Sequence, residues 1–323
     1  MCNFFSAIIV DKNRKALWDP DIDSHTELLT KFNLKDETTS PNFVRVELLP
    51  PYGDVFNHDL KTWKFKTDQD FRPDWYNEEE AFQTTREAVS KLIDERFIIN
   101  RMIAEIKDGR WWLESGGTIE AVSGGTIEVV SGGTIQVVSG GTIQAVRGGT
   151  IEVVSGGTIQ AVRGGTIEAV RGGTIQAVWG GTIQAVRGGT IQAVRGGTIE
   201  AVWGGTIEAV WGGTIQAVWG GTIEVVSGGT IQAVRGGTIE AVSGGTIEAV
   251  SGGTIQVVSG GTIEAVWGGT IQAVSGGTIQ AVSGGTIGGV LERGIVIYPA
   301  DKKIVVADPK MKIVRFKAKK VKK

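Results

Sequence analysis

Few side chains of this 323-residue chain have an obvious chemical role. The single cysteine, Cys2, follows the initiator methionine, and removal of Met1 would leave a thiol next to a free amine. N-terminal-nucleophile amidohydrolases activate their nucleophile in this way, although a small buried cysteine without a catalytic role is the interpretation that we favour. The two histidines, His25 and His58, are too few for a catalytic triad or for a metal site argued from spacing. We therefore expect no catalytic residue, no metal and no cofactor.

Arginine and tryptophan recur at one position of an internal repeat and form the candidate binding surface. Both residue types are enriched at binding hot spots and can stack on a partner chain, a sugar ring or a nucleic-acid base. Serine also occurs at this position, so drift among related codons in an expanded repeat is an alternative explanation. We expect a protein partner or self-assembly, with a glycan or nucleic acid as the alternative, and no membrane contact. The candidate residues are Arg147, Arg163, Arg171, Trp179, Arg187, Arg195, Trp203, Trp211, Trp219, Arg235 and Trp267.

The C-terminus is a second candidate contact, because every charged residue after Asp308 is positive. A solvated tail is the simpler interpretation, and a contact with nucleic acid or another anionic surface is the alternative. The tail residues concerned are Lys317, Lys319, Lys320, Lys322 and Lys323.

The repeat that carries the arginines and tryptophans is an octapeptide. The tetrad Gly-Gly-Thr-Ile begins at Gly116 and recurs without insertion up to Gly284, which makes 22 copies. Each copy reads GGTI[EQ][AV]V[SRW], apart from the last, in which Gly288 and Gly289 fill positions 5 and 6 and Leu291 fills position 8. The repeat explains why the chain contains 49 glycines without the three-residue period of collagen.

The variation among the copies indicates which positions are buried. Isoleucine at position 4 and valine at position 7 are constant, as expected of an interior. Position 8 accepts serine, arginine and tryptophan, whose volumes differ too much for a packed core, and position 5 exchanges Glu for Gln, so both positions should face solvent.

These features predict a β-solenoid. Two adjacent glycines in every octad disfavour a helix, whereas Thr, Ile and Val favour strands and glycine favours tight corners. Stacked coils would bury a continuous column of isoleucine and valine and pair the backbone from one coil to the next. The pattern leaves two or three octads per coil open, and we prefer two.

The segment before the repeat predicts a small α+β domain. Strands are expected at 3–10, 43–49 and 62–66. Ser24-His25-Thr26-Glu27 has the form of a capping box that opens a helix through Phe32. Asn77 should cap a long amphipathic helix that runs toward Ile106 and is closed by Asp108-Gly109. Trp111 and Trp112 then lie where they would cover one end of the Ile/Val column.

After Val290 the repeat ends, and the short apolar segments that follow predict a β cap over the other end of the solenoid. The expected fold is therefore mainly β, with three parts. Residues 1–114 form the small α+β domain, 115–289 the octapeptide-repeat β-solenoid, and 290–323 the β cap with the basic tail.

Two resemblances support this organisation. The V-S-G-G-T run is similar to repeats in the passenger domains of AIDA-type autotransporter adhesins, which implies a β-helix. The segments M-C-N-F-F-S-A-I, D-S-H-T-E-L-L and F-V-R-V-E-L-L-P-P resemble an uncharacterised bacterial and phage family in which a similar N-terminal domain precedes short β repeats. That second resemblance implies a phage or mobile-element setting and no particular activity.

Composition sets the remaining expectations. A net charge of −2 gives no global attraction to nucleic acid or membranes. No signal peptide or stretch of about 20 apolar residues is evident, which predicts a cytoplasmic protein, with virion association as an alternative. We expect a non-catalytic structural or protein-interaction solenoid. The alternatives are a polymer-binding module that uses the Arg/Trp rows and an N-terminal-cysteine amidohydrolase.

Overall fold

The chain divides into two compact units in the computed structural model. The first contains Met1–Ile98 and Gly109–Glu114, and the second contains Ile99–Asp108 and Ser115–Lys323. Neither of the described helices is long and apolar enough to cross a membrane. The structure describes residues 5–10, 14–35, 42–276, 278–280, 282–283, 286–287, 295–299, 305–306 and 312–316.

The first unit is built on a four-stranded antiparallel sheet with the strand order β2-β1-β3-β4. One face of helix α2 contributes Ala81, Thr85, Ala88, Val89 and Leu92 to the core, and the helix packs against β3. The elements of the unit are β1 (Phe5–Val10), β2 (Ala16–Leu17), α1 (His25–Lys31), β3 (Phe43–Leu49), a 3-10 turn (Pro51–Gly53), β4 (Lys64–Thr67), α2 (Glu78–Arg96), β5 (Phe97–Ile98) and β7 (Arg110–Leu113).

Several expectations for this unit are confirmed and two are wrong. The strand at 43–49 has the predicted bounds, the strand expected at 62–66 lies at Lys64–Thr67, and the Asn77 side chain accepts a hydrogen bond from the backbone N–H of Glu80. Ser24 does precede α1, but its side chain makes no capping hydrogen bond, so the capping box is not formed.

The second error concerns the end of α2. We expected the helix to continue toward Ile106, but it ends at Arg96, and the chain then forms β5 and, in the second unit, β6 (Met102–Ile106). Between these strands Asn100 has a φ of 47°, which a helix interior does not allow. Ile98 and Ile106 are buried, and such β-branched residues pack well on strands.

Trp112 is buried in the first unit, where its ring stacks on Phe97 with 5.0 Å between the ring centroids. The role of Trp111 and Trp112 in covering an end of the Ile/Val column stays a prediction.

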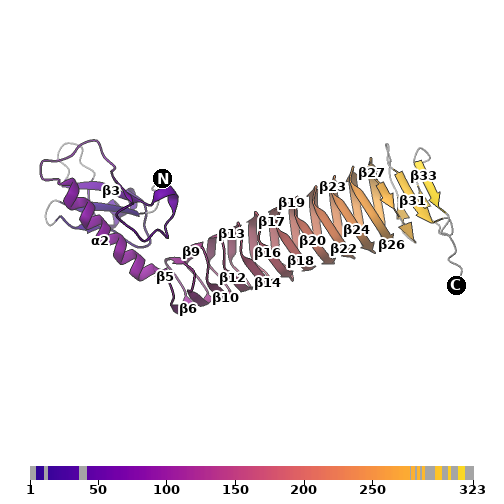
Figure 1. Ribbon diagram of the computed structural model, residues 1–323, viewed down its shortest axis with the longest axis horizontal. Helices are drawn as coiled ribbons and strands as arrows, with labels where there is room; N and C mark the ends of the chain where they lie inside the picture. Colours follow the sequence, from indigo (N-terminus) through magenta and orange to yellow (C-terminus); the bar gives the residue numbers. More distant parts are fainter. Residues whose placement is uncertain are drawn as a thin grey trace. The chain divides into compact units, whose positions relative to one another are not determined.

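The second unit is a parallel β-solenoid, as predicted (Figure 1). It has about 11 coils. Each repeat from Gly116 to Ser275 forms one strand that starts at the threonine of position 3. The five-residue strands are β8 (Thr118–Val122), β9 (Thr126–Val130), β10 (Thr134–Val138), β11 (Thr142–Val146), β12 (Thr150–Val154), β13 (Thr158–Val162), β14 (Thr166–Val170), β15 (Thr174–Val178) and β16 (Thr182–Val186). The six-residue strands, which include position 8, are β17 (Thr190–Arg195), β18 (Thr198–Trp203), β19 (Thr206–Trp211), β20 (Thr214–Trp219), β21 (Thr222–Ser227), β22 (Thr230–Arg235), β23 (Thr238–Ser243), β24 (Thr246–Ser251), β25 (Thr254–Ser259), β26 (Thr262–Trp267) and β27 (Thr270–Ser275).

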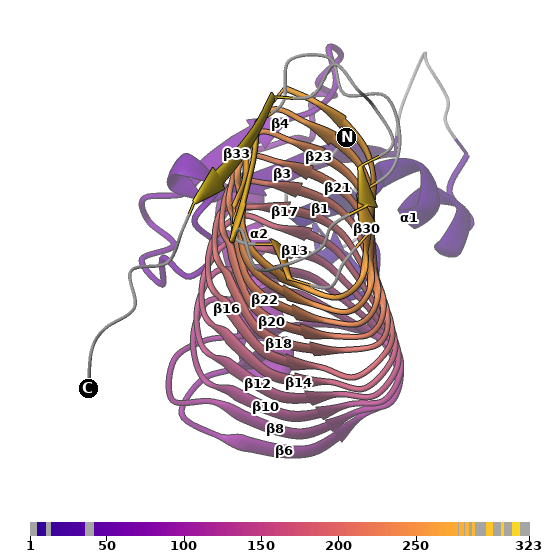
Figure 2. The same ribbon diagram turned by 90° about the vertical axis from the view of Figure 1, so that its right-hand side faces the viewer.

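Two octads complete one coil, which confirms the preferred alternative. Thr118 pairs with Thr134 and Thr126 pairs with Thr142, so every strand lies in register on the strand two repeats later. The even-numbered and odd-numbered strands therefore form two parallel sheets, which face each other across the coil interior (Figure 2). The backbone N–H of position 3 also donates a hydrogen bond to the carbonyl oxygen of the second glycine in the preceding coil, as Thr134 does to Gly117 at 3.0 Å.

The interior is the predicted column of isoleucine and valine. Ile215 is fully buried and Val218 is 3 % exposed, although the two are three positions apart on one strand. A flat strand would place them on opposite faces. The register pairs positions 3, 4, 6, 7 and 8 but omits position 5, so the strand bends there and turns both side chains inward.

The C-terminal strands continue the same two sheets. β28 (Thr278–Gln280) pairs in parallel with β31 (Ile295–Pro299), which pairs with β33 (Lys312–Phe316). β30 (Thr286–Ile287) pairs with β32 (Val305–Val306), and β29 (Val282–Ser283) pairs with β26. The β structure expected after Val290 is present within the described residues.

Candidate functional site

The two-octad coil arranges the position-8 side chains in two rows. Side chains two octads apart in the sequence lie on neighbouring coils, and the two octads of a coil are its two halves, so the rows follow opposite edges of the solenoid. We call the row that follows the even-numbered strands ladder A: Ser123, Ser139, Ser155, Arg171, Arg187, Trp203, Trp219, Arg235, Ser251 and Trp267. Ladder B follows the odd-numbered strands: Ser131, Arg147, Arg163, Trp179, Arg195, Trp211, Ser227, Ser243, Ser259 and Ser275.

Within each ladder some of the large side chains stack on one another from coil to coil. In ladder A the Arg187 guanidinium lies 5.1 Å from the centre of the Trp203 ring, and that ring stacks on Trp219 at 5.1 Å with 8° between the planes. In ladder B the corresponding distances are 5.2 Å from Arg163 to Trp179 and 5.0 Å from Arg195 to Trp211.

The backbone supports this stacking. From β17 onward position 8 belongs to the strand. From Trp211 to Ser275 the carbonyl of position 8 also accepts a hydrogen bond from the preceding coil, as Trp219 does from the N–H of Gly204 at 3.2 Å. We call each position-8 side chain a rung of its ladder. Successive rungs are held at the strand spacing of about 4.8 Å, which is close to the spacing that stacked aromatic rings prefer.

Tryptophans of the ladders are stacked on their neighbours and partly exposed at the same time. The five tryptophans keep between 37 % and 58 % of their surface exposed, which confirms that position 8 faces solvent. A flat ligand needs about 7 Å between the two planes that sandwich it, twice the contact distance of about 3.5 Å. Neighbouring rungs are too close for this, so a base or sugar cannot enter between two adjacent large rungs.

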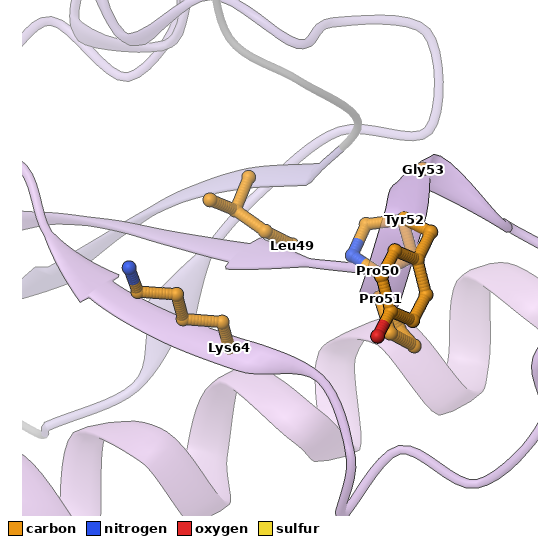
Figure 3. Close-up of a pocket in the computed structure, with 6 residues that line it drawn as sticks. All are labelled: Leu49, Pro50, Pro51, Tyr52, Gly53 and Lys64. Atoms are coloured by element: carbon orange, nitrogen blue, oxygen red, sulfur yellow. The ribbon is translucent and has the colours of Figure 1, made fainter.

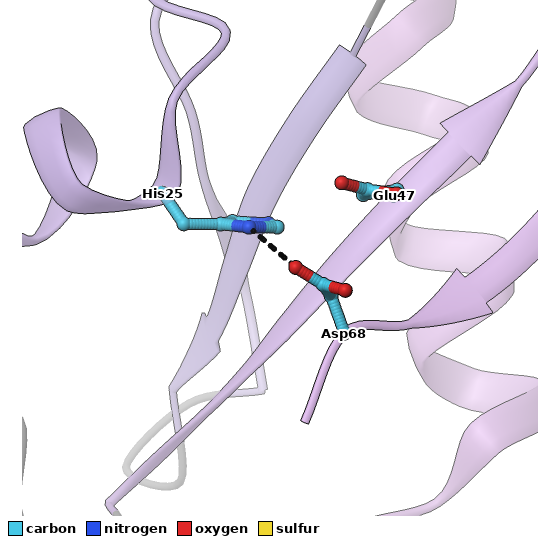
Figure 4. A group of neighbouring side chains, drawn as sticks. All are labelled: His25, Glu47 and Asp68. Carbon is cyan, nitrogen blue, oxygen red and sulfur yellow. Dashed lines mark ion pairs between the residues drawn. The ribbon is translucent and has the colours of Figure 1, made fainter. Parts of the chain in front are cut away.

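The first unit holds a separate cluster of titratable groups, which joins His25, Glu47, Lys66 and Asp68. His25 Nδ1 lies 3.3 Å from Asp68 Oδ2, and its Nε2 lies 3.0 Å from the Val46 carbonyl oxygen (Figure 4). The Lys66 ammonium contacts Asp68 Oδ1 at 2.6 Å and Glu47 Oε2 at 3.3 Å.

The ligand atoms of His25, Glu47 and Asp68 lie within 4.8 Å of one another, a spacing at which one nitrogen and two oxygens could hold a divalent cation. Lys66 already supplies a cation to both carboxylates, however, and the two His25 nitrogens already face Asp68 and the Val46 carbonyl oxygen. The geometry is that of a network of compensated charges, and the described residues give no further sign of a metal.

The ion pairs of this network predict an acid-sensitive contribution to stability. The hydrogen bond from Lys66 lowers the pKa of Asp68 below its ordinary 3.8, and the same hydrogen bond raises the pKa of Lys66. A carboxyl group whose pKa is lower in the folded state stabilises the fold fully above the unfolded value, and this contribution is lost as the pH falls below about 3.8.

We therefore expect Asp68→Asn to reduce the loss of unfolding free energy between pH 6 and pH 3, as measured by urea unfolding of both chains. Asp70→Asn is the matched control, because Asp70 is exposed and forms no ion pair with the described residues. Equal pH dependence of the parent chain and Asp68→Asn would show that the pair contributes nothing.

A hollow of about 430 Å³ lies beside the turn that follows β3 (Figure 3). Its only charged side chain is Lys64, and the lining is otherwise largely apolar, so it presents no acid–base pair. The lining residues are Leu49, Pro50, Pro51, Tyr52, Gly53 and Lys64.

The remaining predicted sites are not brought together with these features. His58 pairs with Glu114 at 2.8 Å in the first unit. Cys2 lies outside the described residues, as does the basic tail of Lys317, Lys319, Lys320, Lys322 and Lys323. The His25 cluster was not predicted from the sequence. The stacking in ladder A was not predicted either, but Arg187, Trp203 and Trp219 are spaced two octads apart, and this spacing was the signal that could have identified it.

Fold and geometry define the chain as a parallel β-solenoid protein with stacked Arg/Trp ladders. No family model, curated protein or solved structure matches the chain, so the family resemblances described above stay predictions.

Proposed function

We propose that the chain is a non-catalytic structural protein whose solenoid serves as a spacer or display rod and makes its contacts with protein partners. The observation that supports this proposal most strongly is the packing of Arg187, Trp203 and Trp219 on one another in ladder A. Ring faces that pack on a neighbouring side chain of the same ladder stabilise the stack of coils, and these faces are not free to bind a polymer.

The register supports the same role. Positions 3, 4, 6 and 7 keep the same register from β8 to β27 without insertion, so the two sheets are continuous over this segment. A regular parallel stack with a continuous apolar interior is stiff, and its length increases with the number of repeats. Both properties suit a spacer.

The competing function is a polymer-binding module, which the partial exposure of the five tryptophans favours. Replacing the five repeat tryptophans by serine separates the two functions. We expect each lost rung contact to lower the stability of the solenoid by about 0.5 to 1 kcal/mol. We also expect neither the parent nor the variant to bind a thymidine oligonucleotide or heparin in a fluorescence anisotropy titration at physiological salt.

The control is a chain with five exposed glutamines changed to serine, which leaves both ladders intact. This control should keep the unfolding profile of the parent. Binding of either polymer by the parent that the tryptophan variant loses and the control keeps would overturn the structural proposal in favour of the polymer-binding one. The control positions are Gln176, Gln184, Gln216, Gln232 and Gln272.

The catalytic alternative rests on Cys2 alone. An amide-hydrolysis activity of the intact chain that Cys2→Ala abolishes would establish it and would contradict the non-catalytic proposal.

A further inference from the structure

Ladder A is interrupted at one rung. Ser251 pairs with Arg235 on the preceding coil and with Trp267 on the following coil. Among the described rungs of both ladders, it is the only serine with a large side chain on each side. One large rung is therefore missing between an arginine and a tryptophan.

The missing rung leaves a notch of about 310 Å³. Arg235 and Trp267 line it, Ser251 is the rung between them, and Ala233 and Val234 of β22 complete the lining. Two coil spacings separate the rungs of Arg235 and Trp267, or about 9 to 10 Å. Unlike the gap between adjacent rungs, this separation exceeds the roughly 7 Å that a sandwiched flat group needs.

The two flanking groups are free to bind. Trp267 is 58 % exposed, the largest value among the repeat tryptophans, because its register partners on the two neighbouring coils, Ser251 and Ser283, are both small residues. Arg235 forms no ion pair with the described residues, so its positive charge has no carboxylate partner there. Elsewhere in the ladders the same two residue types satisfy each other by direct stacking, as Arg187 and Trp203 do.

We propose that this notch binds a planar aromatic ring that carries a carboxylate. The ring replaces the missing rung and stacks on Trp267 at about 3.5 Å. The space that remains on the other side, about 6 Å, accommodates the carboxylate and a charge-assisted hydrogen bond from Arg235. The Ser251 hydroxyl offers a further donor between them. This site is independent of the structural role proposed above.

The test is a titration of the intact chain with 5-fluoroindole-3-acetate, followed by the broadening of its ¹⁹F NMR signal. We expect saturable binding by the parent, and at least about tenfold weaker binding of 5-fluoroindole, which lacks the charge, and of trifluoroacetate, which lacks the ring. Arg235→Ser should weaken binding of 5-fluoroindole-3-acetate by a similar factor, and Trp267→Ser should abolish it.

Ser251→Trp provides the sharpest variant, because it restores the missing rung and closes the notch while both flanking residues remain. Ser259→Trp is its matched control, since it adds a tryptophan to ladder B between Ser243 and Ser275 and leaves the notch open. We expect Ser251→Trp to lose binding and Ser259→Trp to keep it. No saturable binding by the parent, or binding that survives both Ser251→Trp and Trp267→Ser, would overturn the proposal.

Discussion

Gly221→Ala is expected to destabilise the middle of the solenoid by about 2 to 5 kcal/mol, while Gly220→Ala costs only about 1 kcal/mol. Both glycines have a left-handed backbone, with φ of 76° and 73°. A Cβ added at Gly221 would lie 2.7 Å from the Gly205 carbonyl oxygen and 2.9 Å from the Gly204 carbonyl carbon of the preceding coil. A Cβ at Gly220 would meet nothing within 4 Å. The first substitution adds a backbone clash to the strain, and the second adds strain alone.

Native-state hydrogen exchange of the intact chain measures this difference, because it reports the opening free energy of the coils around residues 205–237 separately from the rest. Equal amide protection in Gly221→Ala and Gly220→Ala would mean that neighbouring coils are not in close contact at the second glycine.

Ile215→Ala is expected to cost about 2 to 5 kcal/mol in the same region. Ile215 is fully buried, and the isoleucines of the two neighbouring coils, Ile199 and Ile231, lie in register with it. Truncation removes buried methyl groups and leaves a cavity that identical rigid neighbours cannot fill.

The exposed neighbour Gln216 gives the control, since Gln216→Ala should change the opening free energy by less than about 0.5 kcal/mol. Hydrogen exchange over 199–234 checks both variants. Similar protection in Ile215→Ala and Gln216→Ala would contradict the placement of position 4 in a packed column.

The identity and variation of the repeats made the solenoid predictable. Because 22 copies experience nearly the same surroundings, their differences indicate which positions are exposed, and the burial of Ile215 and the exposure of Trp219 confirm that inference. The number of octads per coil was harder to predict, because equivalent repeats give the same local pattern whether two or three close a coil. Only the pairing of each strand with the strand two octads later decides it.

The end of α2 was not predictable from local pattern. Ile98 and Ile106 continue a spacing that an amphipathic helix could also use, and their place on strands depends on partners distant in the sequence. β5 pairs with β7, and β6 pairs with β8. Tertiary pairing therefore overrides the helical pattern after Arg96.

The charged cluster of the first unit was missed for a similar reason. Glu47 and Lys66 are register partners on β3 and β4, and His25 and Asp68 reach the same place from α1 and from the segment after β4. Strand register determines which side chains meet, and a one-residue slip would put Glu47 on the other face.

The central claim, that two octads form one coil, can be tested by cysteine cross-linking in a Cys2→Ser chain. A disulfide needs Cα atoms about 4.4 to 6.8 Å apart, which neighbouring coils at about 4.8 Å provide and opposite edges of the solenoid do not. Cysteines at Ser243 and Ser259, which are register partners two octads apart, should form a disulfide readily under mild oxidation. Cysteines at Ser243 and Ser251, one octad apart, or at Ser251 and Ser275, three octads apart, should not. Efficient cross-linking of the three-octad pair, without cross-linking of the two-octad pair, would contradict this architecture.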